Sequence, residues 1–176
     1  MRATSNKGFT VLEMLLSVTV LAMLLAAVAV AVHGSLTNSA ENAKIAAATQ
    51  AARFALNRIM RDIRTAAAVD EYAGSTKVTI VPPEDGSGTQ QIQYEYDAGQ
   101  RTLLYHVTVN GSKTTHTLFG GQDDVTVRSF HAIYELGKDW QDLDCTRSVT
   151  VRIEFEVDNQ TFAVTASAAP RRNQLY

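Results

Sequence analysis

Few side chains in this sequence are suited to nucleophilic or metal chemistry. Cys145 is the only cysteine, so no disulfide can form within the chain. No histidine lies near it in the sequence, which disfavours a thiolate nucleophile. His106 and His116 flank the hairpin signal Asn110-Gly111 and are expected to face each other. We interpret them as a cross-strand polar pair, with a two-histidine metal site as the alternative.

The acidic residues of the C-terminal half do not form a recognisable active site either. Asp139, Asp142 and Asp144 surround Trp140, but a calcium loop usually has more oxygen ligands and a glycine at its turn. Glu154 and Glu156 share one face of an alternating segment, and with Arg152 beside them they indicate a solvated face rather than paired catalytic acids. No phosphate-binding loop or nucleophile elbow is present in the sequence. We predict no catalytic residue, no metal and no cofactor.

One carboxylate stands where a charge is costly. The segment from Phe9 to Val32 is 24 residues long and Glu13 is its only charged residue. A helix of about 20 apolar residues spans a bilayer, and a charge at its centre costs about 2.5–3.5 kcal/mol. Arg2 and Lys7 precede the segment and predict a cytoplasmic N-terminus.

The residues alone leave three interpretations of this segment open. It can be a retained membrane helix with a specific role for Glu13, or a plain uncleaved anchor. It can also be a secretory signal peptide, because Ala27-Val28-Ala29 and Ala29-Val30-Ala31 offer small-residue cleavage sites. The length of the segment and the position of Glu13 favour a retained helix.

The motif Gly8-Phe9-Thr10-Val11-Leu12-Glu13 resembles the processing site of type IV prepilins. The resemblance implies that residues 1–8 are a leader peptide, that a prepilin peptidase cuts after Gly8, and that Phe9 becomes the N-methylated first residue. It also implies that Glu13 is the acid at the fifth mature position, which serves assembly. Cleavage frees an amine on Phe9, and Glu13 lies about one helical turn further on, within reach of that amine or of a neighbouring chain's.

Several partners and a location follow from this resemblance. It implies contact with a prepilin peptidase/N-methyltransferase, with other pilin or pseudopilin subunits, with an inner-membrane assembly platform and with membrane lipid. The expected location is the bacterial cytoplasmic (inner) membrane, crossed once, with an extracytoplasmic head domain that enters a filament on assembly. Some pseudopilins bind calcium, so a calcium loop near Trp140 stays an alternative.

The helical pattern continues beyond the membrane-length segment. Residues 33–69 contain no proline and carry an apolar stripe at helical spacing, typical of a helix that packs on a sheet. They hold five basic and two acidic residues, a net charge of +3, which is too dilute to indicate nucleic-acid binding. We predict one helix from Phe9 to about Ala68, with residues 9–32 in the membrane. The stripe consists of Ile45, Ala52, Leu56, Ile59, Ile63 and Ala66.

Residues 70–176 change to the two-residue period of strands. Fifteen acidic and nine basic residues give this region a net charge of −6. Turn signals at Asp97-Ala98-Gly99-Gln100, Asn110-Gly111 and Asp158-Asn159-Gln160 separate short strands and predict hairpins. The predicted fold is α+β, a long N-terminal helix packed on an antiparallel sheet. Seven strands are expected, at residues 77–81, 91–96, 101–109, 114–119, 125–135, 149–157 and 162–167.

The resemblance extends, more diffusely, into the head. The segment Leu56 to Ala66 is similar to the late helix of J-type minor pseudopilins of type II secretion and of related minor pilins. The spans Val127 to Trp140 and Val164 to Asn173 are similar to their later strands. The lack of a cysteine pair departs from many major pilins and favours a minor subunit. The expected function is thus a structural subunit of a type II secretion, type IV pilus or DNA-uptake filament. The competing class is a membrane-anchored β-domain that binds a ligand and does not polymerise.

Overall fold

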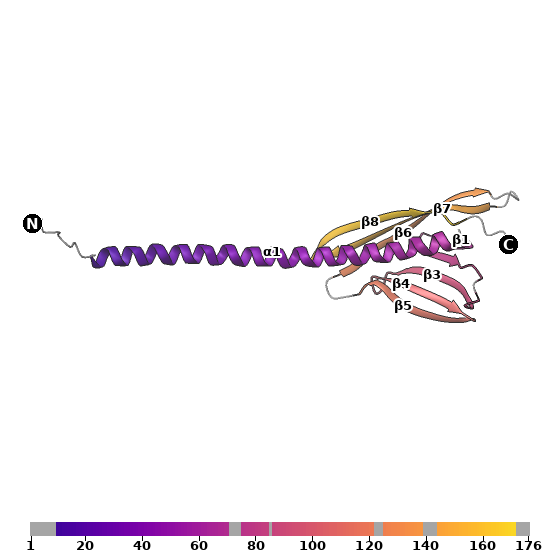
Figure 1. Cartoon of the computed structure of the whole chain (residues 1–176), viewed down its shortest axis with the longest axis horizontal. Helices are drawn as coiled ribbons and strands as arrows, with labels where there is room; N and C mark the ends of the chain where they lie inside the picture. Colours follow the sequence, from indigo (N-terminus) through magenta and orange to yellow (C-terminus); the bar gives the residue numbers. More distant parts are fainter. Residues whose placement is uncertain (1–9, 71–74, 85, 122–124, 139–143, 172–176) are drawn as a thin grey trace, which may run out of the picture. The chain divides into compact units, whose positions relative to one another are not determined.

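The computed structural model describes residues 10–70, 75–84, 86–121, 125–138 and 144–171. One helix and eight strands make up this part of the chain (Figure 1). The chain divides within the helix, between Ala43 and Lys44, into two compact units. In chain order the elements are α1 (Val11–Thr65), β1 (Ala68–Asp70), β2 (Lys77–Val81), β3 (Thr89–Asp97), β4 (Thr102–Val109), β5 (Ser112–Gly120), β6 (Val125–Lys138), β7 (Asp144–Val157) and β8 (Gln160–Ala168).

The α+β prediction is confirmed, with a correction to the sheet. The strands form two antiparallel sheets, in the orders β1-β2-β3-β4-β5 and β6-β7-β8, rather than one meander. Gly120 and Gly121 separate them, both with positive φ angles (84° and 76°). A Cβ atom at Gly120 would lie 2.9 Å from the carbonyl oxygen of Arg101. Only glycine therefore allows the chain to leave β5 so close to the start of β4.

The predicted hairpin turns are present at their expected positions. Asn110 and Gly111 both have positive φ angles (49° and 80°), between the paired residues Val109 and Ser112. Asp158 and Asn159 form the same kind of two-residue turn between β7 and β8. Both turns need left-handed backbone at two positions, which Asn, Asp and Gly tolerate best. The turn residues thus set the register of both hairpins.

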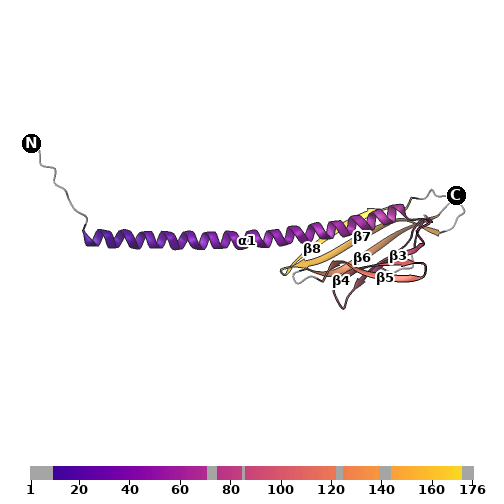
Figure 2. The ribbon, with the colours of Figure 1, turned by 60° about the horizontal axis from the view of Figure 1, so that its bottom comes forward.

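The later half of α1 packs on the sheets through the predicted stripe (Figure 2). Ala52, Ile59 and Ile63 are fully buried, and Ile45 is half-buried at the edge of the core. The helix ends at Thr65, three residues before the predicted end, because the chain turns into β1. The remaining core comes from inward-facing residues of both sheets, among them Val78, Leu103, Phe130, Val151, Ile153 and Phe155.

Polar contacts fix the position of the helix on the first sheet. The hydroxyl of Tyr94, on β3, donates a hydrogen bond of 2.5 Å to the carboxylate of Asp62 on α1. Burial raises the pKa of Tyr94, and the nearby Asp62 carboxylate raises it further. The guanidinium of Arg58 lies 4.0 Å from the ring centre of Tyr105 on β4. These side chains join two helical turns to two adjacent strands.

Candidate functional site

The first turn of α1 is built by a local hydrogen-bond network around Thr10. The carbonyl oxygen of Thr10 accepts hydrogen bonds from the backbone N–H groups of Glu13 (3.1 Å) and Met14 (3.2 Å). Its hydroxyl oxygen also accepts from the N–H of Glu13, at 3.3 Å. Thr10 is therefore the N-cap of the helix, and it satisfies a backbone donor that has no intrahelical partner.

This cap places Glu13 at the third helical position. Its carboxylate lies near the positive end of the helix dipole, where a negative charge is stabilised by about 0.3–1 kcal/mol. The backbone oxygen of Glu13 accepts a hydrogen bond from the hydroxyl of Ser17, at 2.7 Å. Its side chain is exposed and makes no hydrogen bond or ion pair with another described residue. The carboxylate is thus presented outward from the first turn.

The sequence of the first turn contains a local pattern that predicts this cap. The prediction of a helix that starts at Phe9 did not use that pattern. A Ser or Thr followed three residues later by Glu, before an apolar segment, is the capping-box pattern, and Thr10-Val11-Leu12-Glu13 matches it. Gly8 and Phe9, the predicted processing residues, lie outside the described residues. The structure therefore places Glu13 and its cap, and the two residues of the processing site stay predictions.

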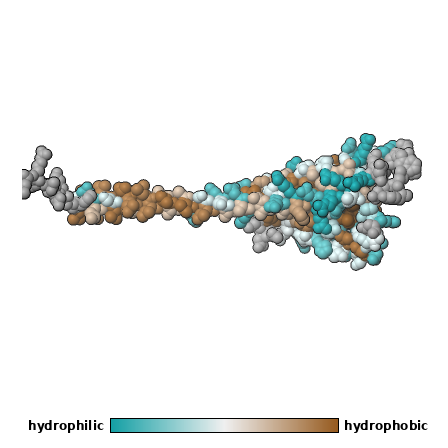
Figure 3. Space-filling view, viewed as in Figure 1, coloured by the Kyte–Doolittle hydropathy of each residue, from teal (hydrophilic) through white to brown (hydrophobic). Residues whose placement is uncertain are grey.

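The helix after this turn presents apolar side chains on every side. It is long and apolar enough to cross a membrane. Among residues 10–47 none is buried, and the exposed ones include Leu15, Leu24 and Val30 (Figure 3). A helix that is apolar all round needs lipid or other helices around it. The stretch from Met14 to Val32 is therefore suited to a non-aqueous environment.

The two histidines do not form the predicted pair. His116 lies opposite Tyr105, whereas His106 lies opposite Thr115. Neighbouring pairs along a ladder point to opposite faces of the sheet, so the two imidazoles lie on different faces. The prediction was wrong because the Asn110-Gly111 turn pairs Val109 with Ser112, which offsets the two histidines by one residue. His106 is buried; its Nδ1 lies 2.8 Å from the hydroxyl oxygen of Thr115.

The remaining candidates are engaged in surface contacts. A guanidinium nitrogen of Arg152 lies 2.7 Å from one Glu154 oxygen, and the hydroxyl of Ser129 donates to the other at 2.9 Å. These hydrogen bonds, first that of Ser129 and then that of Arg152, lower the pKa of Glu154. The carboxylate of Glu156 pairs with Arg128 at 2.7 Å. Both acids therefore form ion pairs, as their charged surroundings indicated, but they are half-buried rather than fully solvated.

No group of three or more potential metal ligands is found among the described residues. Two of the acids considered for a calcium loop, Asp139 and Asp142, lie outside that part of the chain. The thiol of Cys145 lies 3.3 Å from the carbonyl oxygen of Gly137 on the neighbouring strand. None of these positions brings together a nucleophile and a base.

Comparison with known proteins finds a family match at the N-terminus of the chain. Residues 4–29 match the family model of the prokaryotic N-terminal methylation motif. No curated protein and no solved structure matches the chain. The matched residues contain Gly8, Phe9 and Glu13 together with the first turns of α1, and the architecture, a long apolar helix packed on antiparallel sheets, is consistent with a pilin-like fold. The N-terminal segment of the chain therefore carries the methylation motif of type IV prepilin-like proteins, which are structural subunits, and the match supports that family.

Proposed function

We propose that this protein is a minor pseudopilin or minor pilin, a structural subunit of a type II secretion or type IV pilus filament. The methylation motif at residues 4–29 carries the proposal. The leader, residues 1–8, is removed by a prepilin peptidase after Gly8, and the new N-terminal Phe9 is methylated. The chain waits in the inner membrane, crossing it once with its N-terminus in the cytoplasm, until it enters the filament.

The first turn of α1 supports a role for Glu13 in that step. Because Thr10 caps the helix, Glu13 is not needed to satisfy the first backbone donors. Its exposed carboxylate can then pair with the amine of Phe9 in a neighbouring subunit. Glu13 lies about one helical turn from Phe9, so this pair would offset two parallel helices by about one turn. Removing one partner of a buried ion pair costs about 3–5 kcal/mol, so the offset would be strongly favoured.

The head supports a structural role rather than an enzymatic one. Its potential nucleophile and acids serve strand contacts and ion pairs, as described for Cys145, Glu154 and Glu156. Its two sheets and the stripe of α1 form one compact unit, residues 44–176. The surface of this unit is suited to contacts with other subunits of an assembly platform or filament, and nucleic acid is not an expected partner.

The mass of the mature protein tests the proposal. The full chain is expressed in a bacterium with its prepilin peptidase, and in the same strain without the peptidase. Intact mass and N-terminal sequencing are expected to show a start at methylated Phe9 only when the peptidase is present. The variant Gly8→Val is expected to keep residues 1–8 in both strains.

Two other results contradict the proposal. A mature protein that starts near Val30 or Val32 is a secreted domain released by a signal peptidase. A protein that keeps Met1 in the presence of the peptidase is a simple anchor, and the head is then a membrane-anchored binding module. If processing occurs as expected, loss of protein secretion or loss of pili in a deletion strain distinguishes the two kinds of filament.

A further inference from the structure

The two sheets have four outer edges, and two of them are protected. The strands at these edges are β1, β5, β6 and β8. An unprotected edge exposes backbone N–H and C=O groups that pair readily with another strand. The edge at β1 is only three residues long, and the hydroxyl of Thr146 donates to the carbonyl oxygen of Val69 there, at 3.2 Å. This edge is too short for further pairing.

The edge of β6 is covered by the other sheet. The N–H of Val127 donates to the carbonyl oxygen of Arg101 at 2.9 Å, and the N–H of Ala132 donates to that of Ser75 at 2.8 Å. The hydroxyl of Tyr96 donates to the carbonyl oxygens of Val127 and Arg128. Several backbone groups of this edge, from Val127 to Ala132, are thus already used within the molecule.

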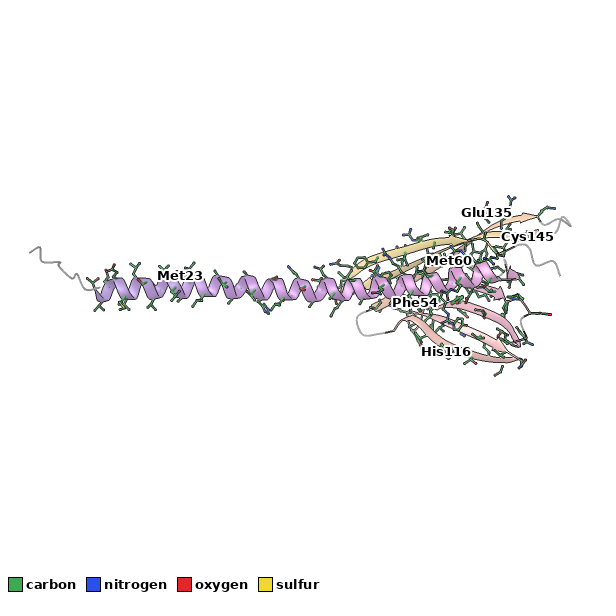
Figure 4. The ribbon with its side chains drawn as sticks, in the orientation of Figure 1. Met23, Phe54, Met60, His116, Glu135 and Cys145 are labelled. Carbon is green, nitrogen blue, oxygen red and sulfur yellow. The ribbon has the colours of Figure 1, made fainter. Side chains whose placement is uncertain are left out.

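The edges of β5 and β8 are open. Each strand has nine residues, and among the described residues no backbone hydrogen bond outside the sheet ladders involves either of them. The strand β8 contains no charged residue and no proline, and its pairing with β7 has no bulge. In β5, Lys113 lies near the start and a bulge near the end, which leaves an uncharged stretch around His116 (Figure 4). The edge of β8 therefore lacks the usual protection against pairing, and in β5 the lysine and the bulge protect only the two ends of the strand.

The two open edges run in opposite directions relative to α1. The turn before β8 lies beside Lys44, whose ammonium is 3.8 Å from Asp158. Beyond its other end, the N–H of Arg171 donates to the carbonyl oxygen of Arg64, at 3.3 Å. The strand β8 therefore runs parallel to the helix from its residue 44 to its residue 64.

The strand β5 runs the other way. Its last residue, Gly120, lines a hollow together with Lys44 and Ala47 of α1. Its neighbour β4 starts at that hollow with Thr102 and reaches Tyr105 beside Arg58, so β4 runs parallel to the helix. Because β5 is antiparallel to β4, it runs antiparallel to α1. The edges of β5 and β8 also lie on opposite sides of the head (Figures 1 and 2).

We propose that these edges pair with each other between copies, the β8 edge of one copy binding the β5 edge of the next as an antiparallel strand. This inference rests on the proposed function, since copies anchored in one membrane point their helices the same way. Antiparallel pairing of β8 with β8 would require opposed helices, whereas β8 with β5 does not. The contact joins different surfaces on opposite sides of the head, so it is a heterologous contact to which each copy contributes a different edge.

The strand lengths define the register. Full overlap of the two nine-residue strands places Ser112 opposite Ala168 and Gly120 opposite Gln160, hence Thr117 opposite Ala163. Neither Thr117 nor Ala163 is buried in the single copy. Neither strand places an acid or a second lysine opposite Lys113, so the pairing brings no like charges together.

Cysteine cross-linking of the full chain in membranes tests the pairing. All variants carry Cys145→Ser. One tagged copy carries Thr117→Cys and a second, differently tagged copy carries Ala163→Cys. Oxidation is expected to link the two tags when the copies are expressed together, and to give no dimer when either is expressed alone. A mixture of Ala98→Cys, in an exposed turn, with Ala163→Cys is the control for chance collisions.

A second experiment places a positive charge on the edge of β8. Adding Thr165→Lys to the Ala163→Cys copy is expected to abolish the cross-link, whereas Ala98→Lys on that copy is expected to leave it intact. A dimer from Ala163→Cys alone, or a mixed pair no stronger than the control, overturns the proposal. The N-terminus of the same samples is sequenced in parallel. A start at Phe9 without the cross-link refutes the edge pairing alone, and a different start refutes the proposed function.

Discussion

The two halves of α1 share one secondary structure and differ in what surrounds them. Before Ala48 the described part of the helix has no buried residue, and from Met14 to Val32 nearly all its side chains are apolar. From Ala48 to Ile63 seven residues are buried, on a stripe that packs against the sheets of the same chain. The later half is stabilised by its own domain, whereas the earlier half needs lipid or other chains.

Polar residues differ between the halves in the same way. In the later half, Asp62 receives a hydrogen bond from Tyr94, and Arg58 lies over the ring of Tyr105. In the earlier half the carboxylate of Glu13 has no partner among the described residues. An internal partner stabilises the fold, and a missing partner invites an external one. If the proposed function holds, assembly and folding use separate parts of one helix.

The largest effect is expected at Glu13. The variant Glu13→Ala should insert in the membrane and be processed, because the apolar segment and the cap of Thr10 are unchanged. Its incorporation into filaments should fall by tenfold or more, since loss of one partner of a buried ion pair costs about 3–5 kcal/mol. Sheared filaments are quantified by immunoblot against the membrane fraction. Ser17→Ala is the matched control, and normal incorporation of Glu13→Ala would show that the carboxylate has no role in assembly.

The next largest effect distinguishes the two halves of α1 by what each contributes to the free energy of unfolding. Ile63→Ala removes a fully buried side chain of the later half and should lower the free energy of unfolding by about 2–5 kcal/mol. Leu24→Ala, at an exposed position of the earlier half, should change it by less than about 0.5 kcal/mol. Urea denaturation of the detergent-solubilised full chain, followed by near-UV circular dichroism, measures both. Equal losses would mean that the earlier half also packs within its own chain.

The packing of the helix and the position of the hairpin both follow from short sequence patterns that are typical of a single local structure. The apolar stripe of the later half predicted four of its seven buried residues, because a spacing of three and four residues leaves one face of a helix for the core. It missed Ala48, Ala55 and Met60. The dipeptide Asn110-Gly111 predicted its hairpin, since few residues tolerate two successive positive φ angles. Both patterns act locally, within one helical face or one turn.

Other features depend on contacts between distant segments, and local patterns did not predict them. The division into two sheets follows from the approach of Gly120 to Arg101 and Val127, which periodicity does not reveal. The offset of His106 from His116 required the strand register. The contact of Tyr94 with Asp62 spans 32 residues and has no local signal. The cap at Thr10 is the exception, because its pattern is local and could have been recognised from the sequence.

A smaller effect tests the contact between Tyr94 and Asp62. Tyr94→Phe leaves the half-buried carboxylate of Asp62 without its donor and should lower the free energy of unfolding by about 1–3 kcal/mol. Asp62→Asn keeps an oxygen acceptor for the Tyr94 hydroxyl, so it should be milder. The same urea titrations compare the two variants. A larger loss in Asp62→Asn would indicate that the charge of Asp62, rather than the hydrogen bond, holds the helix on β3.

The smallest effect concerns alkaline pH and the head alone. The hydroxyl of Tyr134 donates to the carbonyl oxygen of Lys77 at 2.7 Å, and burial, followed by the charge of Asp70, raises the pKa of Tyr134 to about 12. The protonated phenol is thus favoured in the folded state. Its contribution is complete below the unfolded pKa of about 10 and is lost as the pH rises to about 12.

The measurement is the difference in unfolding free energy between the wild-type chain and Tyr134→Phe across that range. At pH 8 the variant should be less stable by about 0.5–1.5 kcal/mol, the net value of one hydrogen bond. Between about pH 10 and 12 the wild-type chain should lose stability faster than the variant, so that the difference narrows. A constant difference would mean that the phenol titrates alike in both states. Because Tyr134 joins β6 of one sheet to β2 of the other, a narrowing gap would show that this contact between the sheets depends on the protonated phenol.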